Sequence, residues 1–398
     1  MRGPAARPIV VAAGGTGGHL FPAEALAAEL VARGHRVALM TDGRSGTLPA
    51  FPAGEAFVLR GAGIAGRGLL RGGLAAMAMA AGAVQARGLL AGLDAAAVVG
   101  FGGYPSVAPV LATRALRRRP AVVLHEQNAV LGRANRMLAR FADRLALGVA
   151  ETQRVPEGAA AAHAGNPVRP AVRGLAGQGY TPPVGAVRVL VTGGSLGARV
   201  FSDLVPPALA LLPPGLRRRV QVTQQCRAED LDRVRAAYAE AGVTAELATF
   251  FPDLPARLAA AHFVIARAGA STVAELCAIG RPALLVPLPG AIDNHQAFNA
   301  AASGAEVLDQ AALTPAALAD ALTPLLTSPL ALIAAAARVA RNGIPDAAAR
   351  LADLVEAAIN DKAGNDRAGN DKAGGDKAGQ GGAGQDEAVP HNQAEARA

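Results

Sequence analysis

Aromatic residues and cysteines are scarce in this chain. Its 398 residues include no Trp, only 3% aromatic residues and two cysteines, Cys226 and Cys277. Two isolated cysteines outside any CxxC or histidine-rich setting exclude a disulfide scaffold. Hydrophobic residues still make up 51% of the chain, so general disorder is excluded and a core of Leu, Val, Ile and Ala is expected.

Lysine is absent before residue 362, and no GxxxxGK[ST] motif occurs, which excludes a P-loop nucleotidase. Long hydrophobic runs are missing too. The longest uncharged stretch, residues 95–113, is interrupted by three glycines and two prolines, whereas a membrane-spanning helix needs about 20 mostly apolar residues. The N-terminus has no apolar signal-peptide segment. We therefore expect a cytoplasmic protein and not an integral membrane protein.

Charge is unevenly distributed. The net charge is +8, but residues 361–398 hold five basic and seven acidic residues, so residues 1–360 carry +10, all of it from Arg. A basic surplus of this size fits nucleic acid, a phospholipid surface or a phosphorylated substrate.

The length fits two domains, and the same pattern opens each half. Residues 9–13 are predicted as a buried strand, followed by a glycine loop at 14–19, a helix with Pro22 at its first position, and a second strand at 35–41. Residues 187–192 repeat the strand, followed by Gly193-Gly194-Ser195-x-Gly197 and a helix in which Pro206 and Pro207 predict a kink or a new helix start. Such βαβ units predict an α/β protein with parallel sheets.

The rest of the chain continues this pattern. Residues 263–266 and 283–286 are predicted strands around a helix at 272–279, residues 166–184 are a linker, and residues 347–359 are a final amphipathic helix. The tail at 361–398 repeats D-[KR]-A-G-[NG] with almost nothing apolar, so we expect it to be disordered.

The glycine loops suit a phosphate, because backbone N–H groups and a helix N-terminus meet there. The dinucleotide fingerprint GxGxxG fails, since Leu20 stands where its third glycine belongs, although Asp42 could still imitate the ribose-binding acid. An NAD-dependent oxidoreductase is therefore disfavoured. Tight strand-to-helix packing without any ligand is the alternative for each loop.

Polar side chains follow several predicted strands, where ligands bind in open α/β sheets. His19 follows the first loop, as a proton acceptor or a simple helix cap. Residues 125–128 read His-Glu-Gln-Asn, but His125 and Glu126 are adjacent on a strand and do not form a metal site. Thr272 and Glu275 fit a capping box, or Glu275 accepts ribose hydroxyls. With a further cluster at 293–296, these groups predict a ligand cleft between two domains.

Six motifs together resemble the MurG family of bacterial N-acetylglucosaminyltransferases. They run in order through most of the chain: GGTGGHLFP at 14–22, GGY at 102–104, HEQN at 125–128, GNPVR at 165–169, GGSxGAR at 193–199 and RxGAxTxxE at 267–275. The resemblance implies a GT-B fold, two Rossmann-like domains facing across a cleft. These would be an acceptor and membrane-side domain at 1–165 and a UDP-GlcNAc-binding domain at 166–344, with a helix at about 345–360 returning to the first.

The reaction that the resemblance implies is inverting transfer of GlcNAc from UDP-GlcNAc to the C4 hydroxyl of MurNAc in lipid I, undecaprenyl-pyrophosphoryl-MurNAc-pentapeptide. It gives lipid II for peptidoglycan, with no cofactor and no metal required. His19 would be the base. The other implied substrate-binding residues are Thr16, Gly17 and Gly18 facing the sugar and phosphates, Asn128 and Gln296 at GlcNAc hydroxyls, Ser195 and Arg169 at the diphosphate, Ala270, Ser271 and Thr272 at the phosphate end, Glu275 at the ribose and Phe251 at the uracil.

Two departures from the family pattern stand at these sites. Leu196 replaces a usual Gln and removes a donor at the phosphate loop, and Phe251-Pro252 replaces an Ile-Asp type sequence at the uracil contact.

The resemblance also favours peripheral attachment to the cytoplasmic face of the inner membrane, with anionic phospholipid as a partner. Residues 66–87 combine three Arg with Leu and Met in a weakly amphipathic helix, whose alternative is ordinary packing. Nucleic acid is not an expected partner, because no aromatic-rich basic face is present. Other cell-wall synthesis or division proteins are possible partners.

Two other functions remain open at this point. One is a different GT-B transferase that joins a UDP-sugar to a lipid acceptor. The other is a non-catalytic nucleotide-sugar binding protein, which would bind the nucleotide without turnover.

Overall fold

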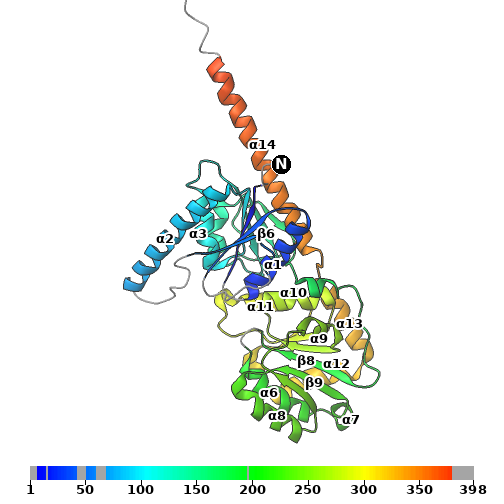
Figure 1. Cartoon of the computed structure of the whole chain (residues 1–398). Coiled ribbons are helices and arrows are strands. Elements are labelled where there is room, and N and C mark those ends of the chain that lie inside the picture. Colours follow the sequence, from blue (N-terminus) through cyan, green and yellow to red (C-terminus); the bar gives the residue numbers. More distant parts are fainter. Residues whose placement is uncertain (1–6, 15–16, 43–50, 60–68, 195–196, 379–398) are drawn as a thin grey trace, which may run out of the picture.

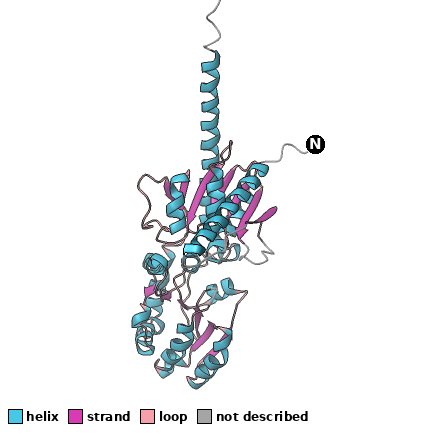
Figure 2. Cartoon of the chain, turned by 90° about the vertical axis from the view of Figure 1, so that its left-hand side faces the viewer, coloured by secondary structure: helices cyan, strands magenta, loops and turns pink. Residues whose placement is uncertain are grey.

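The chain folds into two stacked lobes, each built on one parallel sheet with helices on both faces (Figures 1 and 2). We describe a computed structural model, which covers residues 7–14, 17–42, 51–59, 69–194 and 197–378. The expected α/β class with two parallel sheets is confirmed.

The first lobe holds a seven-stranded sheet in the order β3-β2-β1-β4-β5-β6-β7. All neighbouring strands are parallel, and Ile9 of β1 is in register with Val37 of β2 on one side and Ala97 of β4 on the other. The strands are β1 Ile9–Ala12, β2 Val37–Asp42, β3 Glu55–Leu59, β4 Ala97–Gly100, β5 Ala121–Glu126, β6 Arg144–Leu147 and β7 Ala161–His163. The helices are α1 Gly17–Ala32, α2 Leu69–Leu93, α3 Gly103–Thr113, α4 Arg133–Leu138 and the 3-10 helix η1 Ala139–Phe141.

The second lobe holds a six-stranded parallel sheet in the order β10-β9-β8-β11-β12-β13. Its strands are β8 Val187–Thr192, β9 Val220–Gln225, β10 Thr244–Ala248, β11 Phe263–Ala266, β12 Ala283–Leu285 and β13 Glu306–Val307. The remaining helices are α5 Pro170–Arg173, α6 Arg199–Ala210, α7 Pro214–Arg217, η2 Ala228–Asp230, α8 Leu231–Glu240, α9 Leu254–Ala260, α10 Ala270–Ile279, η3 Ile292–Asn294, α11 His295–Ala302, η4 Gln310–Ala312, α12 Pro315–Thr327, α13 Pro329–Ala340 and α14 Ala347–Ala378.

Each sheet reverses its strand order once, between β1 and β4 in the first lobe and between β8 and β11 in the second. The helices after the two central strands leave toward opposite faces at such a point, so the loops diverge and leave a crevice at the carboxyl ends. The glycine loops predicted from the sequence follow these central strands. The reversal therefore explains why they lie where a ligand can enter.

Helix α14 returns the chain to the first lobe, as Figure 1 shows. Its residues Leu351, Ala352 and Val355 are fully buried in the same core as Leu26 and Leu30 of α1. On the rim of this contact, the Arg33 guanidinium donates to Asp353 at 2.7 Å and to Glu356 at 2.9 Å. The first three turns of α14 are thus part of the first lobe's core.

Beyond the core, α14 differs from the expected disordered tail. The helix continues from residue 361 to Ala378 and projects away from the lobe (Figure 2). Asp361 pairs with Arg144, and Lys362 lies 3.5 Å from Asp143, so the first residues of the tail are anchored to the lobe. Ala, Lys and Asp are compatible with helix once a preceding helix removes the cost of nucleation. Residues 379–398 lie outside the described residues.

Prolines interrupt helices less than the sequence predicted. Pro22 lies inside α1, which begins earlier at Gly17, and Pro206 and Pro207 lie inside α6 and do not start a new helix. Burial of Phe201 and Val205 against the second sheet holds α6 together despite the lost backbone hydrogen bonds.

No helix within the described residues is by itself both long and apolar enough to cross a bilayer, and only the pair α12 and α13 passes together, with a bend of 102° between them.

We expect the buried start of α14 and its projecting half to contribute differently to stability. Leu351→Ala removes a fully buried side chain and should lower the free energy of unfolding by about 2–5 kcal/mol. A chain ending at Asn365 keeps both anchoring pairs and should unfold at the same denaturant concentration as the full chain. Urea denaturation followed by circular dichroism measures both. Loss of folding in the shortened chain would show that the projecting half of α14 stabilises the lobe.

Candidate active site

A cleft of about 670 Å³ lies between the lobes, at the point where both sheets reverse their strand order. The first lobe contributes the start of α1 and the loop after β5, and the second contributes the loop after β8 and the start of α10. Most of the residues predicted for the site line this cleft: Gly18, His19, Asn128, Arg169, Phe251, Ala270, Ser271, Thr272, Glu275 and Gln296.

The remaining predicted residues fall elsewhere. Gly17 is the first residue of α1, one position before the cleft wall. Thr16 and Ser195 lie outside the described residues, as does the departure at Leu196.

The second lobe presents a backbone cradle to the cleft. Gly194 and Gly197 have φ of +79° and +66°, and a Cβ on Gly193 would lie 2.2 Å from the Ala198 nitrogen. Only glycine permits this turn. Beside it, α10 begins at Ala270 after Gly269, and no side chain caps its first N–H groups. Free N–H groups at a helix start together with a glycine turn form an anion-binding site.

Glu275 is held by Arg169, which also lines the cleft. The guanidinium donates two bonds, Nε to Oε1 at 2.7 Å and Nη2 to Oε2 at 2.9 Å, and the Arg169 side chain also lies over the Phe21 ring. The capping box predicted for Thr272 and Glu275 is wrong, because α10 starts two residues before Thr272 and its cap makes no side-chain bond. Glu275 is therefore available as an oriented acceptor in the cleft.

His19 lies in the first turn of α1, on the opposite wall. Its Nδ1 is 2.8 Å from Oε1 of Gln127. The ring rests against the loop after β4, where Gly102 and Gly103 have φ of +82° and +66°. A Cβ on either glycine would lie within 4 Å of the ring, so these glycines allow the backbone to pass close to it.

The residues of the HEQN motif make different contacts. Glu126 is buried, and its two oxygens accept bonds from the backbone N–H groups of Asn128 and Gly132, which shapes the loop after β5. Asn128 reaches the cleft, but its Oδ1 accepts a bond at 3.1 Å from Asn299 of the other lobe. Asn128 thus joins the lobes as well as facing the cleft.

Gln296 keeps a free donor toward the cleft. Its Oε1 accepts from the Leu288 backbone N–H at 2.9 Å, and its amide nitrogen has no partner within the described residues. The cluster at 293–296 also fastens the lobes, since Asp293 pairs with Arg136 at 3.0 Å and with Arg154 at 2.7 Å.

Sequence reasoning missed two residues of the cleft, Gln127 and Arg267. Arg267 is buried, and its guanidinium donates to the carbonyl oxygens of Val286 and Pro287 and to Gln310, all of them neutral acceptors. Burial lowers the pKa of this side chain. A buried cation among neutral acceptors suits an anionic ligand. Gln127 belongs to the motif HEQN and Arg267 to RxGAxTxxE, but the sequence alone assigns site roles only to other residues of these motifs.

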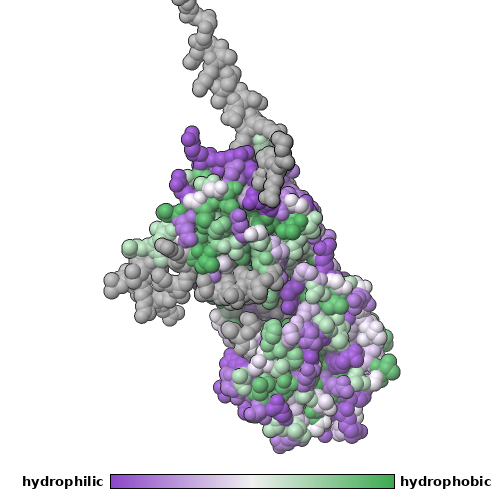
Figure 3. All heavy atoms as spheres, in the orientation of Figure 1, coloured by the Kyte–Doolittle hydropathy of each residue, from purple (hydrophilic) through white to green (hydrophobic). Residues whose placement is uncertain are grey.

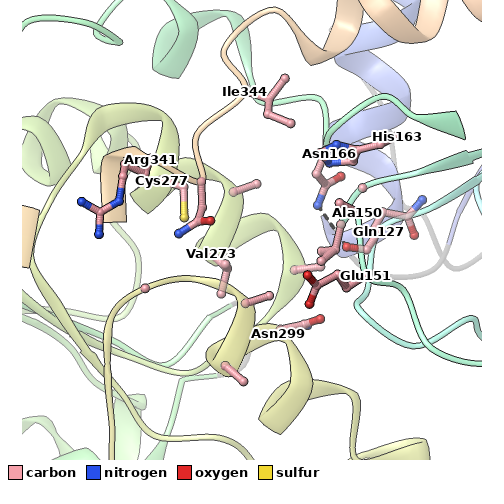
Figure 4. Close-up of a pocket in the computed structure, with 18 residues that line it drawn as sticks. Gln127, Ala150, Glu151, His163, Asn166, Val273, Cys277, Asn299, Arg341 and Ile344 are labelled. Carbon is pink, nitrogen blue, oxygen red and sulfur yellow. Dashed lines mark hydrogen bonds between the residues drawn. The ribbon is translucent and has the colours of Figure 1, made fainter. Parts of the chain in front are cut away.

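A second cavity of about 440 Å³ lies behind α10 (Figure 4). Val273 and Cys277 line it from the second lobe, and Asn166 and Glu151 line it from the first. Gln127 lines both cavities and so stands in the wall between them. In the part of the chain that the structure describes, no group of three or more His, Cys, Asp or Glu is placed to hold a metal ion.

Burial of His125 predicts a pH dependence of stability. The side chain is fully buried, and desolvation lowers its pKa to about 4, while an unfolded chain takes up the proton near the ordinary value of 6.5. The free energy of unfolding should therefore fall as the pH drops from about 6.5 to about 4, with this residue contributing on the order of 3 kcal/mol. In His125→Gln this contribution disappears. Urea denaturation at both ends of that range measures it, and an equal loss in both proteins would contradict the assignment.

Comparison with known proteins gives relatives over most of the chain. A protein from Granulibacter bethesdensis, named UDP-N-acetylglucosamine--N-acetylmuramyl-(pentapeptide) pyrophosphoryl-undecaprenol N-acetylglucosamine transferase, is 58% identical, with 90% of this chain and 96% of that protein covered. A protein of the same name from Acidiphilium cryptum is 56% identical, over 91% of this chain and all of that protein. The crystal structure of Acinetobacter baumannii MurG superimposes with a TM-score of 0.70 at 28% identity, over 88% of this chain and 99% of that one.

These likenesses confirm the GT-B fold and the resemblance to MurG proteins. The model of the glycosyltransferase family 28 N-terminal domain matches residues 9–147, and that of the family's C-terminal domain matches residues 188–351. The first match spans β1 to β6 of the first sheet, and the second spans the strands β8 to β13 of the second sheet. The chain belongs to glycosyltransferase family 28.

Proposed function

We propose that this enzyme transfers GlcNAc from UDP-GlcNAc to the C4 hydroxyl of MurNAc in lipid I, with inversion, and releases lipid II and UDP. The relatives that share 58% and 56% of their residues with it carry the name of this transferase. The observation that carries the proposal is the cleft itself, in which His19 of one lobe faces the glycine turn and open helix start of the other.

The second lobe is the donor side in this proposal. The diphosphate binds at the glycine turn of residues 193–197 and at the first N–H groups of α10, with Arg267 as a buried counter-charge. Glu275 accepts the ribose hydroxyls, and the Phe251 backbone contacts the uracil. Toward the first lobe, the free amide nitrogen of Gln296 and the Asn128 side chain bind GlcNAc hydroxyls.

His19 is the general base. It takes the proton of the acceptor hydroxyl while that oxygen attacks C1 of GlcNAc from the face opposite the phosphate. The C1–O bond to the β-phosphate breaks, and its electron pair stays on the phosphate oxygen. The helix N-terminus and the arginines stabilise this developing charge. No cofactor enters the proposed reaction, since the sugar nucleotide already carries the activated bond.

The first lobe would be the membrane side. On α2, Met77 and Val84 are 71% and 72% exposed, and Val58 of the adjoining β3 is exposed too. Figure 3 shows hydrophobic side chains gathered on this side of the upper lobe, among hydrophilic ones. Apolar side chains next to Arg suit an anionic leaflet, where each positive charge contributes about 1 kcal/mol. The first half of the predicted 66–87 segment, up to residue 76, has side chains outside the described set.

A transfer assay with labelled UDP-GlcNAc and a lipid I analogue tests the function directly. Labelled lipid II is the expected product. UDP binding without transfer would support the non-catalytic nucleotide-sugar protein, and transfer only to a different lipid acceptor would support another GT-B transferase.

Replacing the base tests the mechanism. His19→Ala should lower kcat by about 10²–10⁴-fold, because proton removal is lost, while the Kd for UDP stays near that of the parent protein. His163→Ala removes an exposed histidine outside the cleft and is the matched control. Turnover of His19→Ala at the parent rate would remove His19 from the mechanism.

Glu275 gives a separate prediction for the donor. Glu275→Ala should raise the KM for UDP-GlcNAc about tenfold or more, since charged acceptors of hydroxyl groups contribute roughly 1.5–3 kcal/mol. Glu151→Ala, at an exposed carboxylate, is the control. A lower unfolding temperature with unchanged KM would show that the Glu275–Arg169 pair serves only the fold.

A further inference from the structure

A series of hydrogen bonds leads from Gly165, where the polypeptide crosses between the lobes, to His19. The Gly165 carbonyl oxygen lies 3.0 Å from Nε2 of His125, and Nδ1 of His125 lies 3.0 Å from Nε2 of Gln127. Oε1 of Gln127 then lies 2.8 Å from Nδ1 of His19. Each member has a fixed donor or acceptor role, so the protonation of the whole chain can be worked out from its buried end.

The buried end fixes the tautomer of His125. A backbone carbonyl oxygen only accepts, so Nε2 of His125 must carry the hydrogen that points at Gly165. The ring is fully buried, and burial lowers its pKa to about 4, so it is neutral at physiological pH. A neutral ring with hydrogen on Nε2 has a lone pair on Nδ1. His125 therefore accepts a bond from Gln127.

Two acceptors then fix the orientation of the Gln127 amide. The atom beside Nδ1 of His125 also lies 3.1 Å from the His125 carbonyl oxygen. Both of these neighbours only accept, so that atom must be the amide nitrogen with its two hydrogens. The reversed amide would place oxygen against a carbonyl oxygen and a lone pair. The Gln127 oxygen consequently points at His19.

The last link sets His19 itself. Oε1 of Gln127 only accepts, so the hydrogen of the neutral His19 ring is on Nδ1, and the lone pair is on Nε2. A Cβ on Gly103 would lie 3.7 Å from Nε2, so this nitrogen lies beside the loop after β4, and His19 itself lines the cleft. Without such a partner an imidazole exchanges between its two tautomers, and only one of them has its lone pair on Nε2.

We propose that Gln127 and His125 are positioning residues that hold the neutral His19 ring in the tautomer with a bare Nε2, ready to take the proton of the acceptor hydroxyl. This inference rests on the proposed role of His19 as the base. Neither residue touches the substrate in this role: His125 is fully buried, and Gln127 acts through His19.

The far end of the chain is held rigidly. Gly165 has φ of +82°, and a Cβ there would lie 2.8 Å from the Ile344 side chain, where the chain returns to the first lobe. The Phe101 ring packs against His125 at a centroid distance of 5.3 Å. Gly165, the far end of the hydrogen-bonded series, thus lies where the two polypeptide segments that cross between the lobes touch. The tautomer of His19 therefore depends on residues outside the cleft.

The direct test is the tautomer of His19, measured by ¹⁵N–¹H correlation spectra of the full chain with ¹⁵N-labelled histidine at mildly alkaline pH. The His19 signals are assigned by their loss in His19→Ala. In the parent protein we expect a protonated Nδ1 and a bare Nε2, and in Gln127→Leu a mixture of the two tautomers. A bare Nδ1 in the parent protein would overturn the proposal, whether or not Gln127→Leu folds.

Kinetics provide the second readout. Gln127→Leu should lower kcat about tenfold or more, with the KM for UDP-GlcNAc within about twofold of the parent value. Gln153→Leu, an exposed glutamine of the same lobe, is the matched control. If the parent protein makes no lipid II, or His19→Ala keeps full turnover, the proposed function or its base fails. If His19→Ala is inactive while Gln127→Leu keeps the parent kcat and tautomer, only the positioning role of Gln127 and His125 is contradicted.

Discussion

The reversal of strand order in each sheet is the constraint on which the rest of this structure depends. Parallel strands joined by helices must send the helices after β1 and β4, and after β8 and β11, to opposite faces of their sheets. Backbone N–H groups at these points have no strand to pair with, and the two crevices face each other across the lobes. His19, the glycine turn after β8 and Glu275 all reach the cleft because of this arrangement, since each comes from a loop or helix beside a central strand.

The structure places some of the positively charged arginines in the cleft. The sequence carries a surplus of ten positive charges before residue 361, compatible with three kinds of anionic partner. In the cleft, Arg169 is bound to Glu275, whereas Arg267 is buried among neutral acceptors beside the start of α10. Burying a cation without a counter-charge is costly, so its position beside an anion-binding helix end favours a diphosphate over packing alone.

Local signals in the sequence were sufficient for the strands and insufficient for contacts between distant residues. β8 and β11 begin and end at the predicted residues, because buried runs of Val, Leu and Ile between glycine or polar residues have few alternatives. The predicted capping box is wrong because the partner of Glu275 is Arg169, which is distant in sequence. The role of Gln127 cannot be predicted from the sequence, because it depends on the orientation of the side-chain amide, which its neighbours in space determine.

The proposed reaction requires one binding mode for the donor, and a crystal structure of the protein with UDP-GlcNAc tests it most directly. The diphosphate should lie at the glycine turn of residues 193–197 and the first turn of α10, with the ribose at Glu275 and the sugar facing His19. A nucleotide bound at the glycine loop of the first lobe, or in the cavity behind α10, would contradict the account.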